Sequence, residues 1–419
     1  MPPEKRRIKI SLIGLFGQQN LGNEYTLQAI ISNVYKFIPD AEISCICADP
    51  GDTATRYNIQ TFPILAGYTK GFHVRASSGK DSLLTRLLRK FFINIPLELL
   101  HWVKALKTLK GTQMLIFPGS GILSDYTSRA LGWPYFIFKW SIIAKLCRCE
   151  LLFVSIGAGP ISHSLSKWFL KRALSMADYR SYRDNYSKQY LAGIGFDNKK
   201  DPIYPDLAFS LPVSIKTKSI GRDGQKPVIG VGLKDYYGKL GVPQGNESVY
   251  RDYMEKLCKF ITWLLEHEYT VRLLIGDVLY DNGVKEDLLK LLKKHGVKYD
   301  VEQLINEPIN SVEQLVLQLE KTDIVVSPRF HNVILALMLD KLAVSLSYHE
   351  KFTELMASVS LADYCQDIDH LDIDKLIRQV VELEQRSAYF KQSLRQRVKE
   401  HSTALDEQYK VIFRNYLPV

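Results

Sequence analysis

The stretch from Thr322 to Leu339 constrains the fold of this 419-residue chain more than any other feature of the sequence. After Asp323 it carries an apolar, β-branched run, Ile-Val-Val, which predicts a buried strand, and the apolar run after His331 predicts a buried helix. Arg329 and His331 stand between them, at the carboxyl end of the strand and the amino end of the helix. Ligands bind at this position in open α/β sheets. Since the amino end of a helix favours negative charge, an arginine there predicts an anionic ligand.

Strands and helices are expected to alternate along both halves of the chain. The predicted strands are Ile8–Ile13, Ala41–Ala48, Gln113–Phe117, Glu150–Ile156, Tyr179–Tyr182, Ile203–Ala208, Val228–Leu233, Val271–Ile275, Asp323–Ser327 and Leu342–Ser347. The predicted helices are Tyr25–Phe37, Tyr135–Cys147, Ser166–Met176, Tyr186–Gly193, Tyr250–His267, Lys285–His295, Val312–Lys321 and His331–Leu339. This alternation is typical of parallel sheets with right-handed crossovers, so we expect an α/β protein with two Rossmann-like domains facing a cleft.

One polar, glycine-containing stretch, residues 214–227, interrupts the alternation and suits an interdomain linker. We therefore expect a first domain over residues 1–213 and a second over residues 228–373. The remainder, residues 374–419, is charged and helical in pattern, and we expect this tail to pack back on the first domain.

The composition, with 46% apolar and 24% charged residues, is ordinary for a soluble globular protein. No apolar run approaches the ~18 residues of a membrane span, and the amino-terminal residues lack the apolar region of a signal peptide. We therefore expect a cytosolic protein. The six cysteines form no Cys-x-x-Cys pair or finger-type spacing with histidine, which favours reduced thiols and gives no reason to expect a metal or a cofactor.

A formal net charge of +10 predicts acidic partners. The chain has neither the basic-aromatic strand pattern of RNA-recognition modules nor a cysteine-histidine finger, so we expect no nucleic-acid partner. Much of the charge lies in residues 80–110, where lysines and arginines alternate with leucines and aromatic residues on both sides of Pro96. Such a basic amphipathic segment can lie on an anionic membrane surface, or it can be a helical insertion that packs on its own domain.

Glycine-rich or polar loops follow the predicted strands of the first half. Their glycines would let backbone N–H groups approach an anion, although a tight structural turn explains each loop equally well when it is taken alone. None is a Walker loop or a Gly-x-Gly-x-x-Gly fingerprint. Asp184 in one of them is expected to cap a helix. The loops are Gly14–Glu24, Gly119–Asp125, Gly157–Ile161, Arg183–Asp184 and Pro205–Asp206.

In the second half, residues 347–351 follow the strand after the Arg329 and His331 helix. This order places His349 and Lys351 near Arg329 and His331 at one sheet edge. Converging cationic and titratable groups suit a ligand with two anionic groups, such as a phosphate and a carboxylate.

These motifs, in this order, resemble the polysaccharide pyruvyl transferase family, and they span most of the chain up to about residue 352. The resemblance implies two Rossmann-like domains arranged as in GT-B glycosyltransferases. It also implies transfer of pyruvate from phosphoenolpyruvate to a sugar as a ketal. The sequence departs from the family pattern at Asn23, at Ser120 and at His349–Glu350.

The resemblance also implies roles for individual residues. The residues expected to be catalytic are His331, Asp125 and Arg329. The residues expected to bind phosphoenolpyruvate are Arg183, Arg329, His331, Lys351, His349, Gly157 and Gly159. The residues expected to bind the acceptor are Asn20, Asn23, Glu24, Ser120, Gly121 and His163. His331, with an ordinary pKa near ~6.5, suits the proton donor, and Asp125 would deprotonate the attacking hydroxyl, although the reverse assignment is open. A solvent-exposed loop position is the simpler reading of His163.

Two other functions stay open. A GT-B glycosyltransferase using a nucleotide-sugar would need a ribose- or diphosphate-binding set, for which Asp277 and Glu307 are the only loose candidates. A non-catalytic scaffold for a sugar polymer is the second alternative. For the pyruvyl transferase, we expect an oligosaccharide acceptor, lipid-linked in exopolysaccharide biosynthesis, and a peripheral position on the cytoplasmic face of the inner membrane.

Overall fold

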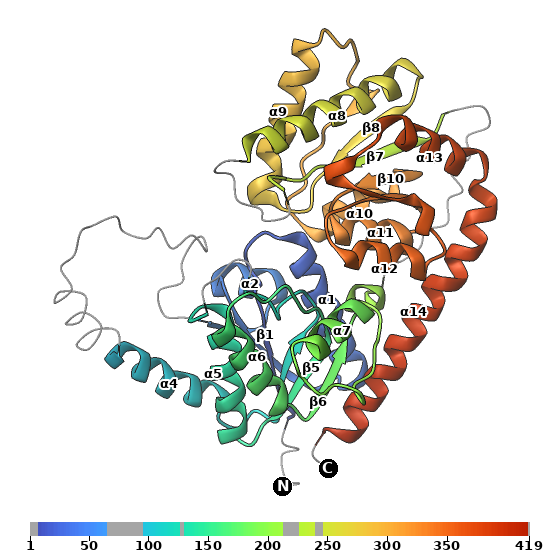
Figure 1. The fold of residues 1–419 in the computed structure, drawn as a ribbon. Coiled ribbons are helices and arrows are strands. Elements are labelled where there is room, and N and C mark those ends of the chain that lie inside the picture. Colours follow the sequence, from blue (N-terminus) through green and yellow to red (C-terminus); the bar gives the residue numbers. More distant parts are fainter. Residues whose placement is uncertain (1–6, 65–94, 126–129, 213–225, 239–245, 418–419) are drawn as a thin grey trace, which may run out of the picture.

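The computed structural model describes residues 7–64, 95–125, 130–212, 226–238 and 246–417. These residues form two six-stranded sheets in which every neighbouring pair of strands is parallel. The first sheet has the order β3-β2-β1-β4-β5-β6 and the second the order β12-β11-β10-β7-β8-β9. In each, the chain reverses direction beside its first strand, as in the doubly wound Rossmann order. The expected α/β fold of two Rossmann-like domains is confirmed (Figure 1).

The first domain is built from the following elements. Its strands are β1 (Lys9–Ile13), β2 (Glu42–Cys47), β3 (Gln60–Pro63), β4 (Met114–Pro118), β5 (Glu150–Ile156) and β6 (Tyr179–Tyr182). Its helices are α1 (Leu21–Phe37), α2 (Pro50–Tyr57), α4 (Ile95–Leu109), α5 (Trp133–Leu146), α6 (Ser164–Ser175), α7 (Asn185–Gly193) and the 3-10 helix η2 (Leu207–Ser210).

The second domain repeats the pattern and ends in two long helices. Its strands are β7 (Val228–Gly232), β8 (Thr270–Leu274), β9 (Leu304–Ile305), β10 (Ile324–Ser327), β11 (Leu342–Ser347) and β12 (Cys365–Asp367). Its helices are α8 (Glu247–Glu266), α9 (Val278–Lys294), α10 (Val312–Glu320), α11 (Phe330–Met338), α12 (Glu350–Ser358), η3 (Ala362–Tyr364), η4 (Ile368–His370), α13 (Ile373–Gln385) and α14 (Ser387–Asn415).

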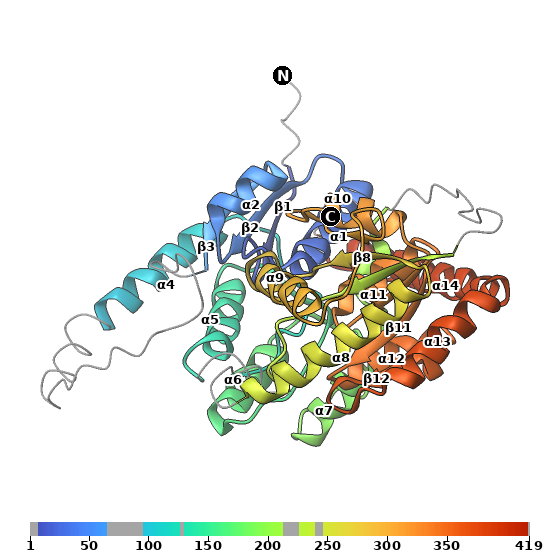
Figure 2. The same ribbon diagram turned by 90° about the horizontal axis from the view of Figure 1, so that it is seen from above.

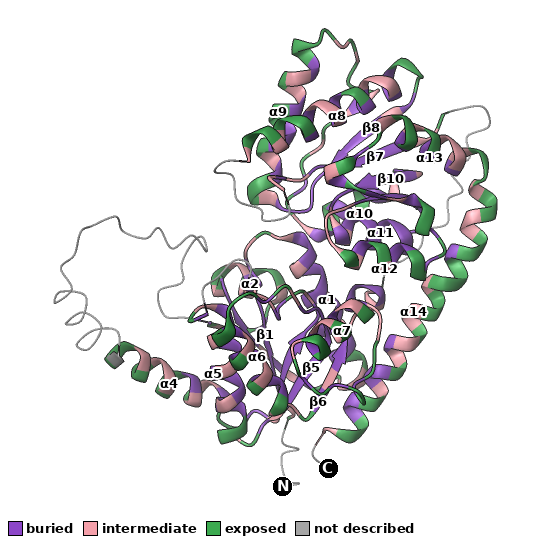
Figure 3. Ribbon diagram, viewed as in Figure 1, coloured by how far each residue is buried: buried purple, intermediate pink, exposed green. Residues whose placement is uncertain are grey.

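Both sheets are covered by helices on both faces. Every residue of β4 and of β10 is buried, and the strands form the buried centre of each domain while the outer helix faces are exposed (Figure 3). This explains why the central strands are continuous apolar runs without alternation.

The structure differs from the sequence prediction in several elements. The predicted strand Ile203–Ala208 is wrong: only a single bridge joins Tyr182 to Ile203, and η2 follows because the Asp206 side chain accepts the N–H of Ala208 at 3.0 Å. Helix α9 begins at Val278 rather than Lys285, capped by the preceding aspartate.

Contacts between the domains hold the carboxyl edges of the two sheets close together. Glu354 on α12 accepts the backbone N–H groups of Asn185 and Tyr186, both at 2.7 Å, and so caps α7 of the first domain. These two helices lie next to each other in both ribbon views (Figures 1 and 2). The loop before α1 pairs with the loop before α9, where Leu21 N–H donates to the Gly276 carbonyl at 3.0 Å.

Helix α14 runs from the second domain along the side of the first (Figure 1). Near its start, Arg395 pairs with Asp340 of the second domain at 2.6 Å. Towards its end, the buried Gln408 donates to Ser181 Oγ at 2.7 Å and accepts from Ser155 Oγ at 3.1 Å, both in the first domain. The helix therefore ties the two domains together.

Two predicted segments fall partly outside the described residues. These are most of the linker 214–227 and the first half of the basic segment 80–110. The second half forms α4, whose Trp102 Nε1 donates to Tyr135 Oη on α5 at 3.2 Å, while Glu98 pairs with Lys139 of α5 at 2.9 Å. No helix in the described parts of the chain is long and apolar enough to cross a membrane.

Candidate active site

The amino-terminal ends of four helices from both domains converge on one small cavity of about 140 Å³. Gly22 of α1, His331 of α11 and Lys351 of α12 lie in the first turns of their helices, and Gly276 precedes the cap of α9; all four line the cavity. The unpaired N–H groups and the dipole at a helix start favour anions. The backbone arrangement therefore suits a negatively charged ligand before any side chain is considered.

A larger cavity of about 870 Å³ adjoins the small one. Its volume falls within the roughly 300–1,000 Å³ typical of ligand pockets. The residues that line both cavities are Gly121, Arg183, Arg329, Tyr348 and Lys351. Three cations therefore lie at the boundary between a small compartment and a large one.

Arg183 follows β6 and lies almost fully buried in the wall between the cavities. Its guanidinium pairs with Asp184 at 3.2 Å and Asp206 at 3.3 Å, and it lies 5.3 Å from the centre of the Phe330 ring. A Cβ on Gly157 would lie 2.7 Å from the guanidinium, so the predicted glycine loop at this position lets Arg183 lie flat against the backbone. Contacts from both domains therefore hold the Arg183 guanidinium in one orientation.

Arg329 occupies the cap position of α11 and pairs with Asp281 of α9. Asp281 is completely buried, and its Oδ2 also accepts the N–H groups of Gly276 and Asp277 at 2.9 Å. Burial disfavours the charge of Arg329, but the Asp281 carboxylate outweighs it and raises the pKa of the guanidinium above its ordinary value. From the sequence this arginine had little structural reason to stand at a helix start, and the buried Asp281 supplies such a reason as an internal partner. Among the described residues, however, Arg329 Nε has no hydrogen-bond partner.

His331 lies in the first turn of α11, and its ring packs against α1 of the other domain. A Cβ on Gly22 would lie 2.2 Å from Nδ1, so this close approach requires glycine. The other ring nitrogen, Nε2, lies 3.8 Å from Asp206 Oδ1 and is without a hydrogen-bond partner in the described chain. Burial, together with the cations Arg183 and Lys351, lowers the pKa of His331 to about 4, although Asp206 acts in the opposite direction. The expectation of an ordinary pKa near ~6.5 is thus wrong for the ligand-free protein.

Two lysines flank the Tyr348 ring at the same sheet edge. The Lys351 Nζ lies 5.6 Å from the ring centre and 5.0 Å from that of Phe330, and the Lys234 Nζ lies 5.1 Å from the Tyr348 ring. Burial and the nearby cation Arg183 lower the pKa of Lys351 to about 7. Burial, with Arg329 nearby, lowers the pKa of Lys234 to about 8. An added anion would stabilise the charge of both lysines.

Lys234 and Asp206 are site residues that the sequence reasoning left out. Lys234 comes just after the predicted strand Val228–Leu233, at the same kind of strand end that drew attention to Arg329. Asp206 belongs to the predicted Pro205–Asp206 loop, but the sequence did not show that it lies between Arg183 and His331. That position depends on the path of the chain at the start of η2. A systematic reading of every strand end would have found Lys234.

His349 and Gly159 line the larger cavity only. The His349 Nδ1 accepts the N–H of Lys351 at 3.2 Å and so caps α12, and its ring meets Tyr186 of the first domain edge-on with the ring centres 5.0 Å apart. Burial, with Lys351 and Arg183 nearby, lowers the pKa of His349 to about 4. His349 therefore holds the start of α12, where Lys351 lies, and contacts the first domain through Tyr186.

The residues predicted on the acceptor side separate into two groups. Asn20, Asn23, Ser120 and Gly121 line the small cavity. Glu24 does not reach it: only 1% of the residue is exposed, and its carboxylate accepts the Gly17 N–H at 2.7 Å and the Tyr57 hydroxyl at 3.1 Å. Asn20 also caps α1 and donates to Asp277 of the second domain at 3.1 Å.

Asp125 and His163 lie outside the linings of both cavities. The two oxygens of Asp125 accept the N–H groups of Ser162 at 2.8 Å and His163 at 2.9 Å, while the exposed His163 caps α6 through its Nδ1. Burial of Asp125 acts against its charge, but these backbone donors lower the pKa of the carboxyl below its ordinary value. The catalytic role expected of Asp125 stays a prediction.

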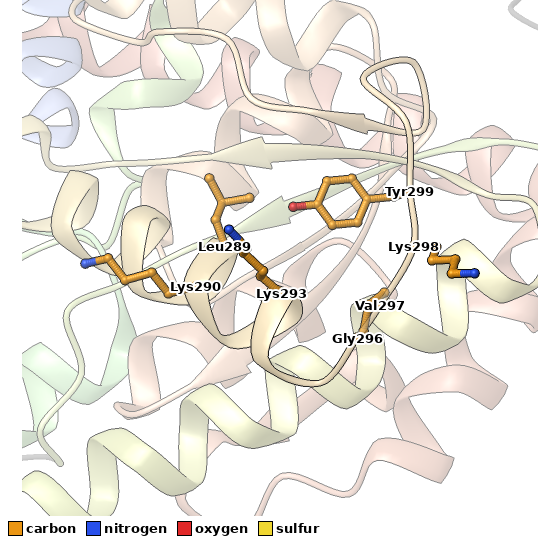
Figure 4. A pocket seen from close by; sticks show the side chains of 7 residues that line it. All are labelled: Leu289, Lys290, Lys293, Gly296, Val297, Lys298 and Tyr299. Carbon is orange, nitrogen blue, oxygen red and sulfur yellow. The ribbon is translucent and has the colours of Figure 1, made fainter.

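Two further observations concern other possible sites. Within the described ranges, no three His, Cys, Asp or Glu side chains are grouped so that they could hold a metal ion. A shallow hollow with three lysines lies at the far end of α9 and the turn after it, around Lys293 and Tyr299 (Figure 4). Because a helix rises about 1.5 Å per residue, even Leu289, the first residue that lines this hollow, lies about 16 Å along α9 from its start at the cavity, so the hollow belongs to a separate surface.

The family of the chain follows from a comparison with protein-family models. The model described as polysaccharide pyruvyl transferase matches residues 20–350. The chain belongs to this family. It is therefore in general terms a transferase of pyruvyl groups that acts on saccharides. The matched range includes every residue that lines the small cavity except Lys351, which directly follows it. No curated protein matches the sequence.

Solved structures show the same fold at low sequence identity. The UDP-GlcNAc 2-epimerase from Neisseria meningitidis, bound to UDP-GlcNAc, aligns with a TM-score of 0.59 at 11% identity over 98% of this chain and all of its own. The UDP-GlcNAc 2-epimerase from Methanocaldococcus jannaschii aligns with a TM-score of 0.55 at 12% identity over 89% of this chain and 92% of its own. A glycosyltransferase from Rickettsia africae gives 0.54 at 11% identity over 98% of this chain and 100% of its own. The expected GT-B-like arrangement is thereby confirmed. At this sequence identity the structural similarity shows the fold and not the function.

Proposed function

We propose that the chain transfers the pyruvyl group of phosphoenolpyruvate to two hydroxyls of a saccharide, forms a ketal and releases phosphate. The observation that carries this proposal is the convergence of Arg183, Arg329 and Lys351 on one small cavity between the domains. Phosphoenolpyruvate carries a phosphate and a carboxylate on the same carbon, C2, and forked guanidinium groups suit both. The family match supports the reaction class.

In the proposed reaction, His331 donates a proton to the methylene carbon C3, and positive charge develops at C2. One acceptor hydroxyl bonds to C2 and gives up its proton; a second hydroxyl then bonds to C2 as the C2–O bond to phosphate breaks. Of the two hydroxyl protons, one replaces the proton lost by His331 and the other leaves with the phosphate. Arg183 and Arg329 stabilise the charge on the departing phosphate.

The low pKa of His331 in the ligand-free protein is compatible with this role. Burial comes first among its causes, but Arg183 and Lys351 contribute as positive neighbours. A bound dianion would neutralise these cations and add negative charge, so it would raise the pKa of His331. Proton uptake would then accompany donor binding.

The decisive test is incubation of the protein with phosphoenolpyruvate and a panel of methyl hexosides and lipid-linked oligosaccharides. We expect phosphate release that depends on the acceptor, and a product heavier by one pyruvyl ketal in mass spectrometry. Phosphoenolpyruvate alone should raise the midpoint of thermal unfolding, because a ligand that binds only the folded protein stabilises it. Stabilisation by nucleotide-sugars instead, without phosphate release, would favour the glycosyltransferase.

The rate should also depend on the charge of Lys351. Its pKa is lowered to about 7, chiefly by burial, so the side chain is cationic below that pH and neutral above it. We expect kcat/KM for phosphoenolpyruvate to fall as the pH rises through about 7, since kcat/KM reports the groups of the free enzyme. The variant Lys351→Arg keeps its charge and should shift this fall to higher pH. A profile unchanged by the substitution would exclude the lysine as the titrating group.

For the acceptor, we propose a lipid-linked oligosaccharide at the cytoplasmic membrane face. Helix α4 supports this, because it projects from the first domain (Figure 1) and exposes Leu99 and Leu100, at 62% and 55%, beside the basic Lys104 and Lys107. Exposed leucines among lysines suit the surface of an anionic bilayer. We expect Leu99→Glu/Leu100→Glu to reduce flotation with anionic liposomes several-fold without changing turnover on a soluble acceptor; equal flotation would reject the proposal.

A further inference from the structure

The part of the larger cavity formed by the second domain contains groups that the donor chemistry does not use. Four carboxylates line this cavity, and tyrosines 186, 236, 280 and 348 line it with them. Aromatic walls with a few placed polar groups are typical of small-molecule sites. A carboxylate oxygen accepts hydrogen bonds and is the group that takes a proton from a sugar hydroxyl. The carboxylates are Asp235, Asp277, Glu350 and Asp367.

Of these four carboxylates, Asp235 differs from the other three in its contacts and its burial. The oxygens of Asp277 are occupied, one by the cap of α9 and one by Asn20 at 3.1 Å. Asp367 caps η4 and is largely exposed. The side chains of Asp235 and Glu350 form no hydrogen bond or ion pair with another described residue, but Glu350 is exposed whereas Asp235 is half-buried. Only Asp235 combines a free carboxylate with a partly desolvated position.

The backbone holds Asp235 in a fixed position relative to the donor-binding arginine. The Asp235 N–H donates to Oδ1 of the buried Asp281 at 3.2 Å, and Arg329 pairs with the same oxygen. The preceding residue, Lys234, lies beside Tyr348, which lines both cavities. Asp235 is therefore anchored beside the boundary where the two cavities meet.

The electrostatic surroundings of Asp235 agree with this assignment. Burial raises the pKa of the Asp235 carboxyl above its ordinary value, against the opposing effect of Lys234. A carboxylate with a raised pKa is a stronger base. Asp125, by contrast, has a lowered pKa, with both of its oxygens occupied by backbone N–H groups.

We propose that the saccharide acceptor occupies the larger cavity and that Asp235 is the base which takes the proton of its first attacking hydroxyl. This inference rests on the proposed function. As that hydroxyl oxygen bonds to C2 of the enol phosphate, its O–H bond breaks and the proton moves to Asp235. The proton then returns through solvent to His331, which has given its own proton to C3, while the second hydroxyl displaces phosphate and its proton leaves with it.

The test uses the full chain, phosphoenolpyruvate and the panel of methyl hexosides. We expect Asp235→Asn to lower kcat for phosphate release at least about 10²-fold, the usual contribution of a general base. Thermal stabilisation by phosphoenolpyruvate alone should be unchanged, since the donor cavity is intact. The control Asp252→Asn makes the same change at an exposed carboxylate of α8 that lines neither cavity, and it should keep wild-type turnover.

A second variant separates a chemical role from a structural one. Asp235→Ala should be equally slow and should regain activity when formate is added, because formate can enter the vacated space and accept the proton. If the wild type is active and Asp235→Asn keeps full turnover, the role of Asp235 as the base is rejected, whereas the proposed function still stands. If the wild type released no phosphate with any acceptor, the proposed function would fail and this inference with it.

Discussion

Replacing Arg183 by glutamine is expected to lower the rate of phosphate release from phosphoenolpyruvate by about 10²–10³-fold, and donor affinity with it. Arg183 lies in the wall shared by the two cavities, and its guanidinium is held by Asp184 and Asp206 in one orientation. A charge that is already oriented stabilises the departing phosphate without reorganisation. Glutamine keeps part of the side-chain volume but lacks the positive charge and the paired N–H donors of the guanidinium. The measurement is initial phosphate release at varied donor concentration.

The matched control is Arg180→Gln on β6, the strand that Arg183 follows. Arg180 forms a bidentate pair with Asp201, at 2.8 and 2.9 Å, and lines neither of the two cavities. Its loss should lower the midpoint of thermal unfolding while turnover below that temperature stays close to wild type. Equal turnover of the two variants would show that Arg183 has no special role and would count against the donor site.

The parts of the site that follow one strand directly were predictable from the sequence. Arg329, His331 and Lys351 stand at ends of buried strands, and the carboxyl ends of parallel strands meet at one edge, so their convergence follows from the fold class. Local pattern and topology were sufficient for these three residues. Gly157, which was predicted to bind phosphoenolpyruvate, lines neither cavity and packs against the guanidinium of Arg183 instead.

The remainder depended on contacts between residues far apart in the chain. Nothing local marks Asp281 as the partner of Arg329, because it lies inside a helix that the sequence pattern placed too late. Similarly, Glu24 and Asp125 look like exposed acidic loop residues but are satisfied by backbone N–H groups once the loops fold. The low pKa of His331 results from burial between two domains, which no single segment encodes.

Three of the four edge strands, β3, β9 and β12, were missed for a different reason, whereas the edge strand β6 was predicted. Strand β3 is half exposed, β9 has only two residues and β12 only three. Short edge strands lack the continuous apolar run by which the central strands were recognised. Their place in the sheets is decided by pairing with β2, β8 and β11, which extends each sheet to six strands.

Replacing Asp281 by alanine should produce the largest loss of stability of any substitution at the site. Asp281 is completely buried and accepts hydrogen bonds from the backbone of Asp235, Gly276 and Asp277 besides pairing with Arg329. Removing one partner of a buried ion pair costs about 3–5 kcal/mol, because the other charge stays buried without compensation. For a domain of this size the midpoint of thermal unfolding should fall by about 6–20 °C.

The control on the same helix is Asp287→Ala. Asp287 is half exposed and pairs with Lys290 at 3.4 Å, and exposed pairs of this kind contribute about 0–1 kcal/mol. Its midpoint should therefore stay within a few degrees of wild type. The double variant Asp281→Ala/Arg329→Leu removes both charges and should recover part of the stability lost in Asp281→Ala, although it would be inactive. If the double variant were no more stable than the single one, the backbone hydrogen bonds rather than the buried arginine would account for the loss.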